Sequence, residues 1–241
     1  MLTGTTARSP RGTIEVAVLI GGQPQPLYRR PGDGALFTAG AEGQAYTLRV
    51  RNLTSARAEV ISTVDGRNTL KDEPGDPQQN RGLVFAANSS GDFTGWRLNA
   101  DQTRQFIFGT PGRSVAAQAT GSQANTGVIG FAAWREWISP DVDLRARYMP
   151  VAFAGPAIPD SAITLNSATT ATRGLGTGIG AAQDDHVGST SFTRTDAADI
   201  LVIGYDTREA LDAMGITGPA GPSAFPGAGT GYEKYAGTLS H

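Results

Sequence analysis

The stretch Tyr46-Thr-Leu-Arg-Val-Arg51 alternates apolar and polar side chains without interruption. In an extended strand, successive side chains point to opposite faces, so the tyrosine, leucine and valine share one face and the threonine and arginines share the other. One buried face and one solvated face are typical of a strand in an antiparallel sheet. The stretch therefore predicts a half-buried strand, and with it an all-β domain.

Similar short apolar runs recur along the chain, punctuated by many of its 32 glycines and 14 prolines. The run over residues 58–64 ends in Asp65-Gly66, a dipeptide typical of a tight turn between strands. Many short strands with almost no helical periodicity indicate an antiparallel β-sandwich or jelly roll. The other predicted strands cover residues 14–20, 82–87, 92–97, 104–108, 114–118, 128–134, 192–194 and 200–205. The predicted core includes Tyr46, Leu48, Val50, Phe106, Phe108, Val128 and Ile203.

A single short helix is predicted near residues 207–214. The stretch Asp206-Thr-Arg-Glu209 has the spacing of a capping box, with Asp206 as the N-cap. Gly215 then supplies a left-handed residue that ends the helix.

The composition divides the chain into three parts. Residues 13–216 are predicted to form the β-sandwich domain, with a proline-rich excursion at 139–173. Residues 1–12 and 217–241 are predicted to be extended terminal arms. The C-terminal arm has too little apolar surface to offset the entropy of ordering it. We therefore expect both arms to lie against neighbouring chains, with Phe225, Tyr232 and Tyr235 as the anchoring side chains of the C-terminal arm.

Charge and residue counts exclude several classes of function. The net charge is −2, so no basic surface is available for nucleic acid. The chain has no cysteine, which excludes disulfides, thiolate nucleophiles, zinc fingers and iron–sulfur clusters. Its two histidines, His186 and His241, are too few for a multi-histidine metal site. The apolar stretches are too short to cross a bilayer and no secretory signal is found, so we expect a cytoplasmic protein, or a virion protein if a phage encodes it.

Two short motifs carry a possible chemical meaning. Gly176, Gly178 and Ala181 match the nucleotide-loop pattern G-x-G-x-x-A. Neither a buried strand before the match nor an amphipathic helix after it is predicted, so we interpret it as a flexible or closely packed glycine turn. The stretch Asp184-Asp-His186 offers metal-ligand types without partners nearby in sequence, and we interpret it as a solvated loop. We predict no cofactor and no metal.

Catalytic patterns are also missing from the sequence. There is no G-x-S-x-G elbow, and a Ser-His-Asp triad would have to use His186 or the last residue. Spacing leaves a carboxylate pair for glycoside hydrolysis open, but aromatic residues are 7% of the chain, few for a sugar-binding cleft. We predict that the protein is not an enzyme and has no catalytic residues.

The most distinctive aromatic positions are Trp96-Arg97 and the stretch Trp134-Arg-Glu-Trp137. Trp96 and Trp134 are expected to pack in the sandwich, with the arginine that follows each lying over a ring or pairing with a carboxylate. Trp137 has the alternative role of an anchor for a neighbouring protein, because tryptophan is enriched at interface hot spots.

Several segments, taken together and in order, carry a resemblance over residues 43–216. The matching pieces are Val64-Asp-Gly-Arg67 with Leu70, Gly95-Trp-Arg97 with Phe106-Ile-Phe108, Gly127-Val-Ile-Gly130, Gly176-Thr-Gly-Ile-Gly180, and Tyr205-Asp206 with Leu211 and Gly215-Ile216. In this pattern the chain resembles a family of uncharacterised β-rich bacterial hypothetical proteins. The resemblance implies one architecture that runs through the proline-rich excursion. It implies no established activity, cofactor or catalytic residue.

Two functions from different classes follow from these features. The first is a non-enzymatic structural assembly protein, such as a phage head decoration, minor capsid or tail protein, that contacts itself or other virion proteins through its arms. The second is a soluble β-sandwich module that binds a sugar or a peptide. Neither function involves nucleic acid or a membrane.

Overall fold

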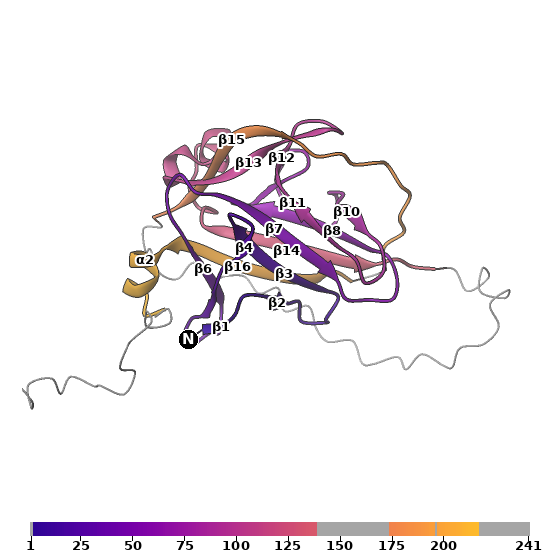
Figure 1. Ribbon diagram of the computed structural model, residues 1–241, viewed down its shortest axis with the longest axis horizontal. Coiled ribbons are helices and arrows are strands. Elements are labelled where there is room, and N and C mark those ends of the chain that lie inside the picture. Colours follow the sequence, from indigo (N-terminus) through magenta and orange to yellow (C-terminus); the bar gives the residue numbers. More distant parts are fainter. Residues whose placement is uncertain (1, 139–173, 196, 217–241) are drawn as a thin grey trace, which may run out of the picture.

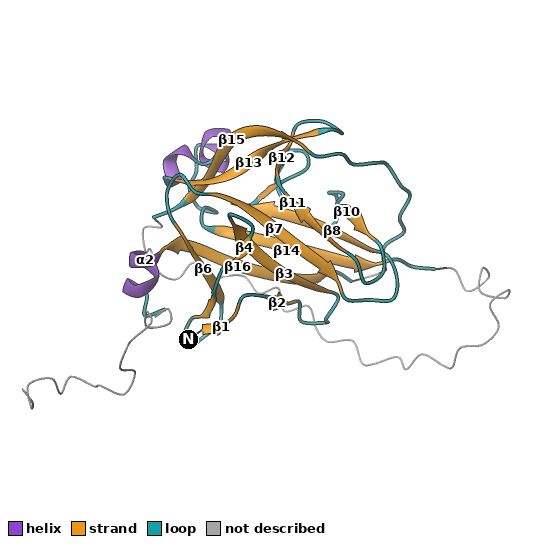
Figure 2. Ribbon diagram, viewed as in Figure 1, coloured by secondary structure: helices purple, strands orange, loops and turns teal. Residues whose placement is uncertain are grey.

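The computed structural model describes residues 2–138, 174–195 and 197–216, which form two β-sheets around one core (Figure 1). The predicted excursion at 139–173, the C-terminal arm and its aromatic residues Phe225, Tyr232 and Tyr235 lie outside the described residues. The described part is mostly strand with two short α-helices, so the predicted all-β class is confirmed. Both helices lie at the margin of the molecule (Figure 2).

The first sheet, sheet A, has eight strands and uses segments from both ends of the described chain. Its order is β1 (Leu2–Gly4), β5 (Leu27–Arg29), β6 (Leu36–Gly40), β16 (Asp199–Thr207), β14 (Val128–Arg135), β8 (Ala58–Val64) and β10 (Leu83–Phe85), with β9 (Arg67–Asn68) paired to β8. All its pairs are antiparallel except β6 with β16. The expectation of a wholly antiparallel sheet is therefore wrong at this pair. The two strands are far apart in sequence, so no hairpin fixes their relative direction.

The second sheet, sheet B, also has eight strands. Its order is β12 (Gly95–Arg97), β13 (Gln102–Gly109), β7 (Ala45–Asn52), β3 (Ile14–Ile20) and β2 (Ala7–Arg8); in addition β11 (Ser90–Phe93) pairs with β7, β15 (Gly176–Asp184) with β13 and β4 (Gln23–Pro24) with β3. Every pair in this sheet is antiparallel. Residues 2–12, expected as an arm, contribute β1 to sheet A and β2 to sheet B.

One large hydrophobic cluster joins inward-facing residues of both sheets, which gives a sandwich-like arrangement. The alternation in β7 is as predicted, because its apolar residues are buried and Arg49 and Arg51 are exposed. All but one of the seven predicted core residues are buried. The exception is Val128, which is half-buried, while Ile129 beside it is in the core. The inward face of β14 is therefore the one that contains Ile129, Phe131 and Ala133.

Helix α1 (Val115–Thr120) occupies residues for which a strand was predicted, so that prediction is wrong. It follows the 3-10 turn η1 (Pro111–Arg113). The hydroxyl of Ser114 accepts the N–H of Ala117 at 3.1 Å, which caps the first turn. Gly121, with φ of 68°, ends the helix. The caps at both ends favour a helix here more strongly than the weak apolar alternation of residues 114–118 favours a strand.

Helix α2 (Arg208–Ala213) confirms the predicted C-terminal helix, with Gly215 in the left-handed region after it. The predicted N-cap is wrong by one residue. Thr207 is the N-cap and accepts the N–H of Ala210 at 3.1 Å. Asp206 is still in β16, and its carboxylate accepts the N–H of Gly174 at 2.9 Å.

Three further strand predictions are corrected by the pairing pattern. Residues 92–97 belong to two strands, β11 and β12, rather than one. Residues 192–194 form no strand, although Arg194 makes an isolated bridge with Glu136. The glycine-rich stretch expected as a turn is strand β15, which pairs along β13.

Candidate functional site

The end of strand β14 presents apolar side chains to solvent. Trp137 is 51% exposed and Ile138 is 60% exposed. The backbone of Arg135 and Trp137 is held by residues 193–195. The N–H of Trp137 donates to the carbonyl of Thr193 at 2.8 Å, and the N–H of Thr195 donates to the carbonyl of Arg135 at 3.1 Å. The structure therefore fixes the position of the predicted anchor Trp137 rather than leaving it on a free loop.

A bidentate ion pair strengthens the same chain end. Arg57, just before β8, donates through Nε and Nη2 to the two carboxylate oxygens of Glu136. The N–H of Glu136 also donates to the carbonyl of Arg57 at 2.9 Å. The guanidinium carbon of Arg57 also lies 5.9 Å from the ring centre of Phe192.

A small pocket of about 190 Å³ opens at the same end of β14. It is lined by Arg11, Thr13, Ala133, Arg135, Thr195, Ala197 and Asp199. The buried carboxylate of Asp199 accepts the Ser9 hydroxyl at 2.6 Å and the N–H groups of Arg11 and Thr13 at 3.0 Å each. This contact fixes the β2–β3 loop of sheet B against the start of β16 in sheet A. We refer to Trp137, Ile138 and this pocket together as the β14 end.

A second polar group, the inter-sheet network, lies inside the sandwich. Its members are the buried side chains of Asp65, Tyr205, Thr177 and Tyr46. The carboxylate of Asp65 accepts the Tyr205 hydroxyl at 2.6 Å, the N–H of Thr177 at 2.7 Å and the N–H of Gly127 at 2.8 Å. The Thr177 hydroxyl lies 2.6 Å from that of Tyr205 and 2.8 Å from that of Tyr46.

Burial dominates the electrostatics of this network. It raises the pKa of Asp65 to about 6, although the hydrogen bonds from Tyr205, Thr177 and Gly127 act in the opposite direction. Burial also raises the pKa of the Tyr46 and Tyr205 hydroxyls, and the charge of Asp65 adds to that rise. Both hydroxyls are therefore neutral donors at physiological pH. The network connects the two sheets. Because its four side chains are buried between them, we interpret its role as structural.

A third polar contact, on the outer face of sheet A, involves Glu59. Arg194 donates to its two carboxylate oxygens at 2.8 and 2.9 Å, and the N–H of Gly82 donates at 2.8 Å. Burial alone would raise the pKa of Glu59, but these donors hold it below its ordinary value. The guanidinium of Arg194 also lies 4.0 Å from the ring centre of Trp134.

The predicted environment of the tryptophans is correct in part. Trp96 is buried in the core and packs edge-on against Phe106. Trp134 is buried in a separate cluster with Ile61 and Ala132. The arginine that covers Trp134 is Arg194. Among the described residues Arg135 neither lies over a ring nor pairs with a carboxylate, so the expectation for Arg135 is wrong. Arg97 pairs with the carboxylate of Asp185 at 3.2 Å, as expected of that arginine.

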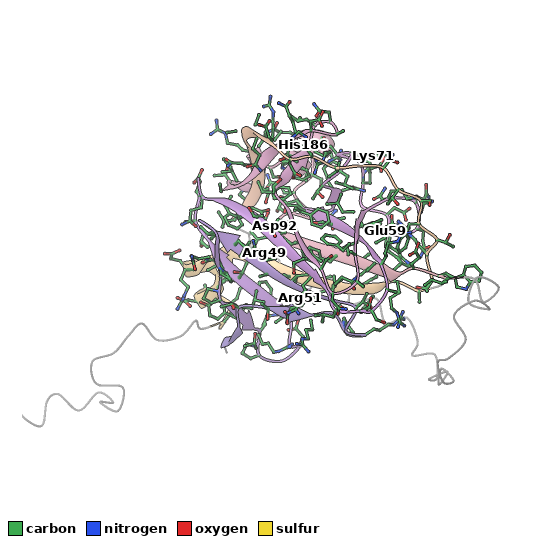
Figure 3. All side chains as sticks on the ribbon, turned by 45° about the vertical axis from the view of Figure 1, so that its right-hand side comes forward. Arg49, Arg51, Glu59, Lys71, Asp92 and His186 are labelled. Atoms are coloured by element: carbon green, nitrogen blue, oxygen red, sulfur yellow. The ribbon has the colours of Figure 1, made fainter. Side chains whose placement is uncertain are left out.

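The stretch Asp184-Asp-His186, interpreted as a solvated loop, is one in part. His186 is exposed, but Asp184 ends strand β15 and Asp185 is half-buried. His186 lies 3.0 Å from the carboxylate of Asp101, and this hydrogen bond raises the pKa of the imidazole. Figure 3 shows it far from Glu59, near the top of the molecule. Within residues 2–138, 174–195 and 197–216, no group of three or more histidine or carboxylate side chains is placed to hold a metal ion.

Compared with protein-family models, curated proteins and solved structures, the chain matches none of them. The function must therefore be argued from the chain's own residues. None of the helices in the described segments is long and apolar enough to cross a membrane.

Sequence reasoning named Trp137 at the β14 end but missed the pocket and the inter-sheet network. The Asp65-Gly66 turn was identified from its sequence, and both residues have positive φ, 51° and 77°. The carboxylate partners of Asp65 are more than 60 residues away in the sequence, so no local pattern could reveal them.

Proposed function

We propose that the protein is a non-enzymatic structural assembly protein, and that the β14 end contacts a neighbouring subunit. The observation that carries this proposal is the exposed pair of Trp137 and Ile138, where the backbone N–H of Trp137 is hydrogen-bonded to residue 193. An exposed large apolar side chain gains free energy when a partner removes it from water, and tryptophan is enriched at binding hot spots.

The buried acidic groups support the same proposal. Asp65, Glu59 and Asp199 each accept several hydrogen bonds from the protein itself. These bonds connect strands and loops to one another. The three carboxylates therefore already bind donors of the fold itself, which supports a structural rather than a catalytic role for them. We propose that the assembly is a virion and that the protein is one of its components, such as a head decoration, minor capsid or tail protein.

Assembly is tested with full-length protein over a concentration series by analytical ultracentrifugation. The proposal expects a concentration-dependent increase in mass that is lost in the Trp137→Ala, Ile138→Ser double variant. The control is Leu98→Ser, which removes another half-exposed apolar side chain remote from the β14 end in the sequence. Equal association of the wild-type protein and the double variant would contradict the role of the β14 end.

The pocket favours a second function, a peptide-binding module. Two arginines, Arg11 and Arg135, are among its lining residues, against one carboxylate, that of Asp199, which already accepts hydrogen bonds from the fold. No aromatic side chain is among the lining residues, and sugars are usually bound by stacking on aromatic rings. An acidic peptide fits the arginines better than a sugar does. Calorimetric titration with a short polyaspartate peptide would detect this binding, and Arg135→Ala should weaken it.

A further inference from the structure

Strand β15 is an unusually long strand at an edge of sheet B. It covers nine residues and pairs with β13 alone. The other strands at the ends of the two sheets, β1, β2, β10 and β12, have two or three residues each. Proteins generally keep sheet edges short because unpaired backbone groups form hydrogen bonds with other chains. Figure 1 shows β15 along the upper margin of the molecule.

The backbone of β15 directs hydrogen-bonding groups away from β13. The N–H of Thr177 donates to Asp65 rather than to β13. Alternate residues of a strand direct their backbone groups to the same side, so Ile179 directs its N–H and carbonyl away from β13 as well. At Thr177, the side of the strand that faces away from β13 is occupied by the carboxylate of Asp65. The open part of the edge begins at Ile179.

The side chains of this open part do not protect it. Ile179 is 53% exposed, and Ala181 and Ala182 are exposed. The strand contains no lysine, arginine or proline, the residues that usually block edge-to-edge pairing. The register of the pairing shifts between Arg104 and Phe106, but the pairing continues to Asp184.

Two exposed charged side chains lie at opposite ends of the open edge. Asp184 ends β15, and Arg113 lies in η1 next to the other end. A Cβ on Gly178 would be 3.8 Å from the carbonyl oxygen of Arg113. Both side chains are exposed, and neither forms an ion pair or side-chain hydrogen bond with any other described residue.

We propose that β15 pairs antiparallel with β15 of a second copy of this chain, about a two-fold axis near Ala181 and Ala182. The register shift adds one residue to β15 between Ile179 and Ala182, so Ile179 and Asp184 both direct backbone groups away from β13. With this axis, Asp184 of each copy lies across from Ile179 of the other, close to the other copy's Arg113. At each end of the interface, Asp184 of one copy then lies near Arg113 of the other, and sheet B continues across the dimer. A parallel pairing would instead place the two Asp184 side chains together.

This proposal extends the proposed assembly function and names one partner, a second copy, at a surface other than the β14 end. The charge pattern gives a direct test by sedimentation equilibrium of the full chain. Arg113→Asp or Asp184→Arg alone places like charges together and should weaken dimerisation about tenfold or more. The double variant Arg113→Asp, Asp184→Arg restores both ion pairs with reversed sign, so it should dimerise like the wild-type protein.

A second test uses the absence of cysteine from the chain. Ala182→Cys introduces a unique thiol beside the proposed axis, and a short bismaleimide should link two copies rapidly. The matched control is Ser55→Cys, an exposed position on the β7–β8 connection. Crosslinking of Ala182→Cys should be lost when Ile179→Lys, which adds a charge to the edge, is combined with it.

The outcomes separate this proposal from the proposed function. If the wild-type protein is monomeric and Ala182→Cys gives no crosslink, the pairing of β15 is overturned. This is the result expected if another segment of the chain covers the edge. A dimer that is insensitive to both charge reversals also overturns it. Loss of association in the Trp137→Ala, Ile138→Ser variant, with intact crosslinking at Ala182→Cys, would show that the two surfaces act separately.

Discussion

The hydroxyl of Tyr205 donates to the carboxylate of Asp65 at 2.6 Å, although the two residues are 140 positions apart in the sequence. The N–H of Thr177 donates to the other carboxylate oxygen, so this one side chain connects β8 and β16 of sheet A with β15 of sheet B. Burial raises the pKa of Asp65 to about 6. The stability of the protein should therefore depend on the ionisation of a group inside its core.

Asp65→Asn should remove a specific part of the pH dependence of stability. The pKa of Asp65 is higher in the folded state than its ordinary value of 3.8, so the folded state binds the proton more tightly. The resulting stabilisation is fully present below pH 3.8 and is lost as the pH rises through about 6. At pH 7 the loss amounts to about 3 kcal/mol. Urea unfolding at pH 4 and pH 7 should therefore show a change in the free energy of unfolding that is less favourable in the wild-type protein than in the variant by this amount.

The control for this experiment is Asp92→Asn. Asp92 pairs with Arg49 on the surface, with 2.8 Å between the Arg49 Nε and a carboxylate oxygen (Figure 3). Its substitution should leave the difference between pH 4 and pH 7 as in the wild-type protein. If the Asp65→Asn variant keeps the full pH dependence, another carboxylate is responsible for it.

The sequence predicts strands well where side chains report the environment. β3 and β8 begin and end at the predicted residues, because their apolar runs are bounded by turn residues. β15 was missed because glycine and alanine form most of it and give no hydrophobic period. It is a strand because it pairs with β13, and that partner lies about 70 residues earlier in the chain.

Features that depend on distant partners also could not be predicted. The turn at Asp65-Gly66 follows from its dipeptide, but the hydrogen bonds of its carboxylate depend on Thr177 and Tyr205. At the β14 end, the tryptophan was an identifiable candidate. The pocket beside it needs the β2–β3 loop to lie against β16, which no local pattern indicates.

Arg194→Ala should be strongly destabilising, although Arg194 is not a member of the inter-sheet network. The substitution leaves the buried carboxylate of Glu59 without its two strongest donors and uncovers the ring of Trp134. Removal of one partner from a buried ion pair costs about 3–5 kcal/mol. Arg49→Ala, which breaks an exposed pair, should cost at most about 1 kcal/mol. Similar values for the two variants in chemical denaturation would mean that Glu59 remains solvated when Arg194 is absent.

Asp101→Asn should lower the pKa of His186 toward its ordinary value of 6.5. The hydrogen bond between the two side chains favours the charged imidazole, and the substitution removes the negative charge that supports it. The measurement is a proton NMR titration of the imidazole resonances, in which His241 serves as an internal reference. The fold should be unaffected, because both side chains of the pair are mostly exposed. An unchanged titration of His186 would show that Asp101 does not contact it in solution.

Gly95→Ala should separate two strands that must approach closely. A Cβ at Gly95 would lie 2.0 Å from the carbonyl oxygen of Arg104, a backbone atom that cannot move without disturbing the pairing of β12 with β13. Overpacking of this kind typically costs about 1–3 kcal/mol. Gly109→Ala is the matched control, because Gly109 lies in β13 and a Cβ there would meet nothing within 4 Å. Thermal unfolding should therefore show a lower midpoint for Gly95→Ala and a midpoint close to that of the wild-type protein for Gly109→Ala. Equal midpoints for the two variants would mean that β12 can move away from β13 at little cost.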